Sequence, residues 1–146
     1  MHCAFLSDCK MMTGLRDEVI PLEEEAIRLH PHYSNIGFYY WRIGMVQLLQ
    51  SRTDEAIVSF EKTASGNPEF FLGHARLAAA YGLNSETGCA ARELAEARKP
   101  FGGRDPYITW MRTAVAPIPK LRDLFEATYF AGLRKAEMPE GRVGAP

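Results

Sequence analysis

The histidine and cysteine residues near the N-terminus come nearest to a metal-binding set. His2, Cys3, Asp8 and Cys9 lie close together in the chain. In a helix, His2 and Cys9 share a face, whereas Cys3 and Cys9 do not. None of them has the Cys-x-x-Cys spacing of a zinc site. Because free cysteine usually packs as a small hydrophobic side chain, we expect no metal centre here and we expect Cys89 to lie in the core.

Three other segments contain residue types found in binding or active sites, but they lack the neighbouring residues that such sites require. Gly102-Gly103 has no preceding strand and no following Lys-Ser or Lys-Thr pair, so it does not match a phosphate loop. His30 stands at a predicted helix end, where a cation is favourable. Glu23-Glu24-Glu25 is typical of a solvated helix face. Because no nucleophile–base pair accompanies these residues, we expect no enzyme activity and no cofactor.

The charge balance argues against several classes of partner. The chain of 146 residues has 17 Lys and Arg against 18 Asp and Glu, a formal net charge of −1. Nucleic-acid binding needs a basic patch, and an anionic membrane attracts clustered basic residues, so we expect neither partner. No apolar run reaches the roughly 18 residues of a membrane span. Three cysteines imply no disulfide framework, and we expect a cytoplasmic protein.

The spacing of apolar residues predicts an all-α fold. Alanine, leucine, glutamate and arginine recur at helical intervals, and alternating strand patterns are nearly absent. We predict helices at residues 2–12, 16–30, 36–51, 54–65, 68–83, 86–99, 105–114 and 119–136. The length predicts about one domain. Residues 1–138 would form a helical repeat domain, and the pattern-free run 139–146 would form a disordered tail.

A 34-residue internal repeat runs through the chain. A shift of 34 positions aligns Arg42 with Arg76, Leu49 with Leu83, Ser51 with Ser85, Thr53 with Thr87 and Ala56 with Ala90. Small residues recur where two helices must approach closely: Gly44 and Ala78 on the first helix, Ala56 and Ala90 on the second. The period, these small residues and Pro68 resemble the tetratricopeptide repeat, a helix–turn–helix unit. The resemblance is strongest in 37–99, although Gln47 stands where the family usually has an aromatic residue.

The resemblance implies a right-handed superhelix of about four antiparallel helix pairs, with residues 105–136 as a degenerate fourth pair. Two stretches, 48–57 and 125–136, further resemble the C-terminal tetratricopeptide region of bacterial adenylate/guanylate cyclase-like proteins. In those proteins the region follows a catalytic or DNA-binding domain, and nothing in this chain resembles the catalytic domain. The alternative function that this resemblance implies is that of a regulatory or oligomerising C-terminal tail of a nucleotide cyclase-like protein.

The main function that the tetratricopeptide resemblance implies is that of a non-catalytic protein–protein interaction module, which binds a peptide or helix of an unidentified partner in a concave groove. In this family the first helix of each repeat lines the groove. The matching positions are Phe38, Trp41, Arg42, Met45, Leu49, Leu72, Arg76 and Arg112. Aromatic residues, methionine and arginine are enriched at binding patches, and arginines can bind carboxylates.

Two interpretations of this surface stay open. If the groove binds a peptide, Trp41, Arg42 and Arg76 are partly exposed, and the two guanidinium groups face the same space. Alternatively, the segment 38–49, which is apolar nearly all round, is a central helix packed between its neighbours. In that case Trp41 is fully buried and the arginines pair with internal acids.

Apolar residues at the two ends of the chain predict a homodimer. Terminal repeats need polar outer faces, and exposed apolar patches mark interfaces. The residues concerned are Ala4, Phe5, Leu6, Met11 and Met12 at the N-terminus and Leu121, Leu124, Phe125, Tyr129, Phe130 and Leu133 near the C-terminus.

Overall fold

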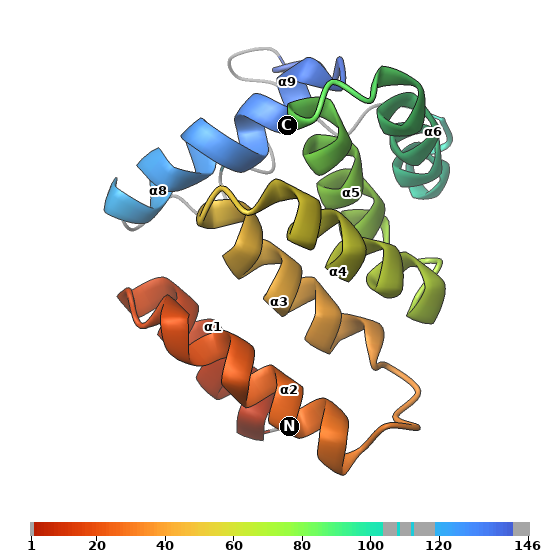
Figure 1. The fold of residues 1–146 in the computed structure, drawn as a ribbon. Helices are drawn as coiled ribbons and strands as arrows, with labels where there is room; N and C mark the ends of the chain where they lie inside the picture. Colours follow the sequence, from red (N-terminus) through yellow and green to blue (C-terminus); the bar gives the residue numbers. More distant parts are fainter. Residues whose placement is uncertain (1, 104–107, 109–111, 113–118, 142–146) are drawn as a thin grey trace.

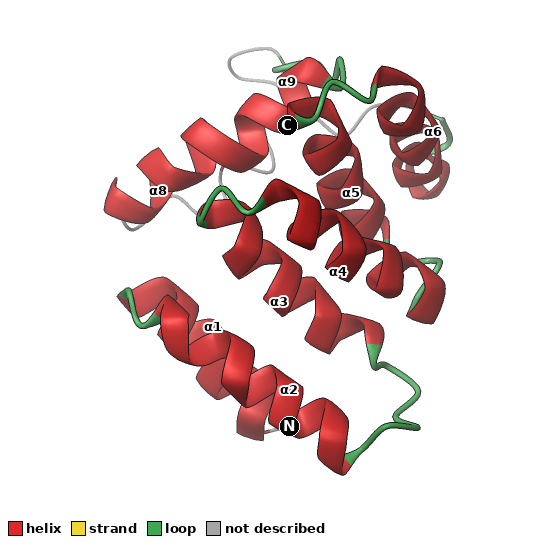
Figure 2. Ribbon diagram, viewed as in Figure 1, coloured by secondary structure: helices red, strands yellow, loops and turns green. Residues whose placement is uncertain are grey.

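The computed structural model describes residues 2–103, 108, 112 and 119–141, and all regular structure among them is helical (Figures 1 and 2). No strand occurs in these residues, which confirms the all-α prediction. The elements are α1 (His2–Thr13), η1 (Arg16–Glu18), α2 (Val19–Leu29), α3 (Gly37–Leu49), α4 (Thr53–Gly66), α5 (Phe71–Leu83), α6 (Thr87–Arg98), η2 (Lys99–Phe101), α8 (Pro119–Phe125), the π-helical turn η3 (Glu126–Phe130) and α9 (Ala131–Lys135). Apart from Ile108 and Arg112, the predicted helix 105–114 lies outside the described residues.

The helices recur with the period of the sequence. Helices α2, α4 and α6 begin at Val19, Thr53 and Thr87, and the bounds of α3 and α5 are also offset by 34 positions. Helix α3 packs against α4, α5 packs against α6, and α2 packs against α3. Figure 1 shows α3 between the α1–α2 pair and α4. The repeat found in the sequence is thus a repeat of helix positions.

Small residues allow the paired helices to cross closely. A Cβ atom on Gly44 of α3 would lie 2.7 Å from the ring of Phe60 on α4. Ala56, Ala78 and Ala90 are all fully buried. These are the positions at which the aligned repeats predict a close approach, so the prediction of their burial is confirmed.

The C-terminal helix α9 does not extend the stack of helix pairs beyond α6. A further pair would pack beside α6, but the main partner of α9 is α5. The two helices touch through their backbones: a Cβ atom on Gly132 would lie 2.8 Å from the carbonyl carbon of Ala79, and one on Gly82 would lie 2.5 Å from the carbonyl oxygen of Gly132. The second half of the predicted fourth pair is therefore packed against α5.

This packing buries the apolar C-terminal stripe on which the homodimer prediction partly depended. Leu121, Phe125, Tyr129, Phe130 and Leu133 are all buried within the chain, and Leu124 is partly buried against the same core, so that half of the argument does not hold. At the other end, Leu6 is exposed and Met11 is buried. The side chains of Ala4, Phe5 and Met12 lie outside the described residues. Self-association itself stays a prediction.

The first two residues of the predicted tail, Pro139 and Glu140, form a hydrogen bond and ion pairs with the rest of the chain. The backbone N–H of Ile108 donates to the carbonyl oxygen of Pro139 at 3.1 Å, and Glu140 pairs with Arg112 and Arg134. Residues 142–146 lie outside the described part of the chain. Among the described residues, each helix is too short or too polar to cross a bilayer.

Candidate functional site

The eight predicted groove residues fall into two groups. Arg42, Met45, Leu49 and Arg76 are buried, whereas Phe38, Trp41, Leu72 and Arg112 are partly exposed. The chain itself provides the cover, because α1 packs on α3, and η3 packs on both α3 and α5. The exposed fractions of Arg42 and Arg76 are 9% and 8%. The expectation that both arginines are partly exposed is therefore wrong.

Arg42 is bonded internally, as the second interpretation predicts. Its Nε donates to Oδ1 of Asp8 on α1 at 3.0 Å, and its Nη1 lies 3.9 Å from Oε2 of Glu23 on α2. Glu23 is fully buried, so the expectation of a solvated face is wrong at this position. Burial raises the pKa of Glu23, because a carboxylate loses its hydration there. The cluster links the first three helices.

Arg76 has no such partner. Its guanidinium carbon lies 3.8 Å from the centre of the Trp41 ring and 5.4 Å from that of Tyr129 on η3. No carboxylate in the described residues forms an ion pair with it, and its Nε and Nη1 have no hydrogen-bond acceptor. Burial lowers the pKa of Arg76 to about 10, so the side chain is still a cation at neutral pH. Trp41 is partly exposed rather than fully buried.

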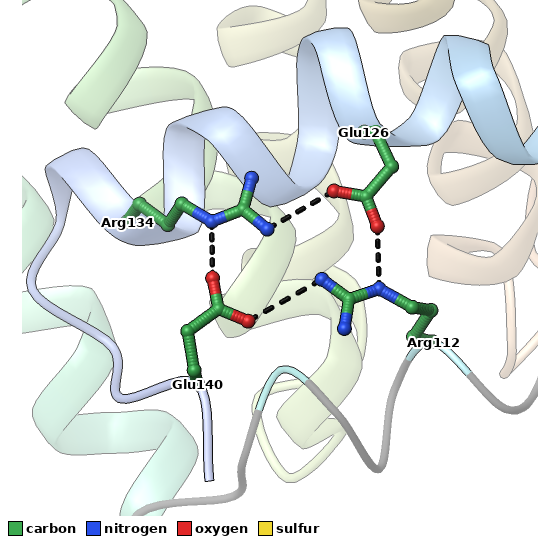
Figure 3. Close-up of polar contacts among 4 residues, drawn as sticks. All are labelled: Arg112, Glu126, Arg134 and Glu140. Carbon is green, nitrogen blue, oxygen red and sulfur yellow. Dashed lines mark hydrogen bonds and ion pairs between the residues drawn. The ribbon is translucent and has the colours of Figure 1, made fainter.

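Arg112 belongs to a ring of charges at the C-terminal end (Figure 3). Its Nε donates to Glu126 and its Nη2 lies 3.3 Å from Glu140. Arg134 closes the ring, with its Nη2 3.0 Å from Glu126 and its Nε donating to Glu140. The hydrogen bond from Arg134 is the main cause of the lowered pKa of Glu140. Arg112 thus pairs with two acids of the C-terminal segment instead of presenting a free charge to a partner.

An open groove lies on a different set of residues, between α2 and α4 and over α3. We call it the α2–α4 groove, and its volume is about 440 Å³. It is lined by Glu24, Ile27, Tyr40, Ile43, Gln47, Glu55, Val58, Ser59 and Lys62. Val58 is 51% exposed. Sequence reasoning missed this groove, and the signal that could have found it was Gln47, where the resemblance implies a larger aromatic side chain.

His74 lies on α5, and each of its two ring nitrogens has a hydrogen-bond partner. Its Nδ1 lies 2.8 Å from Glu93 and its Nε2 lies 2.7 Å from the carbonyl oxygen of Pro68. When the imidazole is protonated, both ring nitrogens donate, one to the Glu93 carboxylate and one to the carbonyl oxygen. The hydrogen bond to Glu93 is the main cause of the raised pKa of His74. The imidazole therefore joins α5 to α6 and has no free nitrogen to act as a base.

Of the four metal candidates at the N-terminus, the structure describes the side chains of Asp8 and Cys9. Asp8 pairs with Arg42, Cys9 is exposed as a free thiol, and the side chains of His2 and Cys3 lie outside the described residues. Elsewhere in the described part of the chain, no group of three His, Cys, Asp or Glu residues could hold a metal ion. Cys89 is partly buried and packs against the core.

Comparisons with known proteins found no matching family, no matching curated protein and no matching solved structure. The resemblances to the tetratricopeptide repeat and to cyclase-like proteins stay predictions.

Proposed function

We propose that the chain is a non-catalytic, tetratricopeptide-like helical repeat module that binds a segment of a partner protein in the α2–α4 groove. The groove supports this function because it combines an apolar floor and walls with charged residues around them. Ile27, Tyr40, Ile43 and Val58 supply the apolar part. Apolar grooves between helices commonly receive amphipathic segments.

The observation that carries the proposal is a difference between the two repeats. One period after Ile27 and Gln47 the chain has Glu61 and Tyr81. The Tyr81 hydroxyl donates to Glu61 at 2.6 Å, so an aromatic side chain of α5 spans to α4. In the first repeat, Gln47 is shorter and bonds to Ser59 of α4 at 2.7 Å. The hydrogen bond of Gln47 is thus made to α4, whereas Ile27, the counterpart of Glu61, lies on α2.

The partner is therefore a segment that inserts an aromatic side chain between α2 and α4. Three charged residues line the groove, and Glu55 among them pairs with Arg52, which leaves one charge of each sign. Glu24 has no ion pair among the described residues, and the Lys62 ammonium lies 5.0 Å from the centre of the Tyr40 ring. A basic and an acidic residue flanking the aromatic side chain would complement them.

The test fills the groove with the two side chains that stand at the equivalent positions of the second repeat. Short helical peptides are selected for binding to the wild-type protein, and their affinity is then measured for the double variant Ile27→Glu with Gln47→Tyr. This variant copies the Glu61–Tyr81 pair, and we expect it to bind the peptides at least about tenfold more weakly, a loss of about 1.4 kcal/mol. Leu15→Glu, at an exposed site that does not line the groove, is the matched control and should bind normally. Equal affinity for the double variant, or a selection that yields no binder, would overturn the proposal.

A further inference from the structure

The two aligned arginines, Arg42 and Arg76, have different surroundings. Arg42 pairs with Asp8, which lies one 34-residue period before it, and is close to Glu23. At the same two offsets from Arg76 the chain has Arg42 and Ile57. The second repeat therefore keeps the arginine but has neither of the acids that neutralise its counterpart.

The groups around Arg76 do not replace those acids. Trp41 stacks on the guanidinium, and the neutral phenol of Tyr129 accepts a hydrogen bond from it. The charge of Asp8 still acts on Arg76, but the Asp8 carboxylate is bonded to Arg42. In the described residues, Nε and Nη1 of Arg76 and Nε1 of Trp41 are buried N–H donors with no acceptor.

A buried cation with unsatisfied donors is costly. Removing a guanidinium from water takes several kcal/mol unless an opposite charge and hydrogen bonds compensate, and each unmade hydrogen bond adds to that cost. Native structures rarely leave such groups without a partner, and a bound water or ion commonly supplies it. Water would satisfy the donors but would leave the charge uncompensated.

We propose that Arg76 binds a small monovalent anion, of the size of chloride or formate, in the interior between α3, α5 and η3. The anion accepts hydrogen bonds from Nε and Nη1 and supplies the negative charge that Asp8 and Glu23 supply to Arg42. It is small, because the unpaired nitrogens are buried and a peptide side chain would have to open the packing of η3 on α3 to reach them. None of the residues that line the α2–α4 groove belongs to this site, so the two proposals are independent.

The test compares thermal unfolding of the full chain in sodium chloride, sodium formate and sodium gluconate at equal ionic strength. Gluconate is too large for the site. We expect chloride or formate to raise Tm saturably, by about 3–6 °C at a tenfold excess over Kd. Whichever of the two gives the larger shift identifies the preferred anion. Arg76→Met keeps most of the side-chain volume and removes the charge, so its Tm should not depend on the anion. Arg122→Met, at an exposed position of α8, should keep the wild-type dependence.

Two results would overturn the proposal: a wild-type Tm that is equal in all three salts, or an Arg76→Met variant that keeps the anion dependence. If Arg76→Met does not fold, the wild-type protein still provides a test. Bound chloride broadens the chlorine-35 resonance of the solution, and formate should reverse the broadening while gluconate should not. Absence of broadening, together with a Tm that does not depend on the anion, would mean that the site holds only water.

Discussion

Gly132→Ala tests the contact between α9 and α5, which the repeat pattern did not predict. The added Cβ atom would meet the carbonyl oxygen of Ala79 and would lie 2.8 Å from its carbonyl carbon and 3.0 Å from its Cα. These are backbone atoms of a packed helix, so they cannot rotate away and the two helices must separate. Overpacking of this kind costs about 1–3 kcal/mol, while replacing a helical glycine contributes about 0.5–1 kcal/mol. We expect a net loss of about 1–2 kcal/mol in the free energy of unfolding.

Gly88→Ala is the matched control. Gly88 lies in α6, and no heavy atom lies within 4 Å of a Cβ atom placed there. Only the helix propensity changes, so the variant should gain up to about 1 kcal/mol. Urea unfolding followed by far-ultraviolet circular dichroism measures both variants, with m expected to stay unchanged. A Gly132→Ala variant as stable as the wild type would mean that α9 does not lie against α5, and the reasoning would be refuted.

Three further predictions concern other contacts of the fold. Ala90→Leu adds methylene groups at a fully buried helix crossing and should lower the free energy of unfolding by about 1–3 kcal/mol; an unchanged Tm would contradict the repeat register. The bond to Glu93 raises the pKa of His74 above the ordinary histidine value of about 6.5, so its stabilisation is fully present below that value and is lost as the pH rises through the folded-state pKa. Urea midpoints at acidic and alkaline pH should therefore differ more for the wild type than for His74→Asn. Glu140→Gln should weaken the ring of Figure 3 by no more than about 1 kcal/mol, because its members are partly exposed, and this cost should shrink in 1 M salt, at about a 3 Å Debye length.

The helices between residues 16 and 99 could be predicted from the sequence because local spacing determines them. The pairing of α3 with α4 and of α5 with α6 follows from the period and from small residues such as Gly44 and Ala90. The place of α9 could not be predicted in this way. Gly82 and Gly132 are far apart in the chain, and only the folded backbone shows that they touch.

The candidate site was harder to predict, because burial depends on what covers a face. The period correctly aligned Arg42 with Arg76, but no local pattern indicated that α1 and η3 would cover them. Glu23 belongs to an acidic run that is typical of a solvated face, yet it is buried on α2 and faces Arg42 on the neighbouring helix α3. The α2–α4 groove depends on one small departure, Gln47, whose meaning becomes clear only beside Tyr81.

The most direct test of partner binding at the α2–α4 groove is a methyl nuclear magnetic resonance titration of the wild-type protein with a selected peptide. Ile27 and Ile43 line the groove, whereas Ile20 packs against the core and does not line it. We predict that the methyl resonances of Ile27 and Ile43 shift and saturate together, and that a peptide lacking its aromatic residue leaves them unchanged. Saturable shifts confined to other methyl groups, with Ile27 and Ile43 unmoved, would contradict the proposed function.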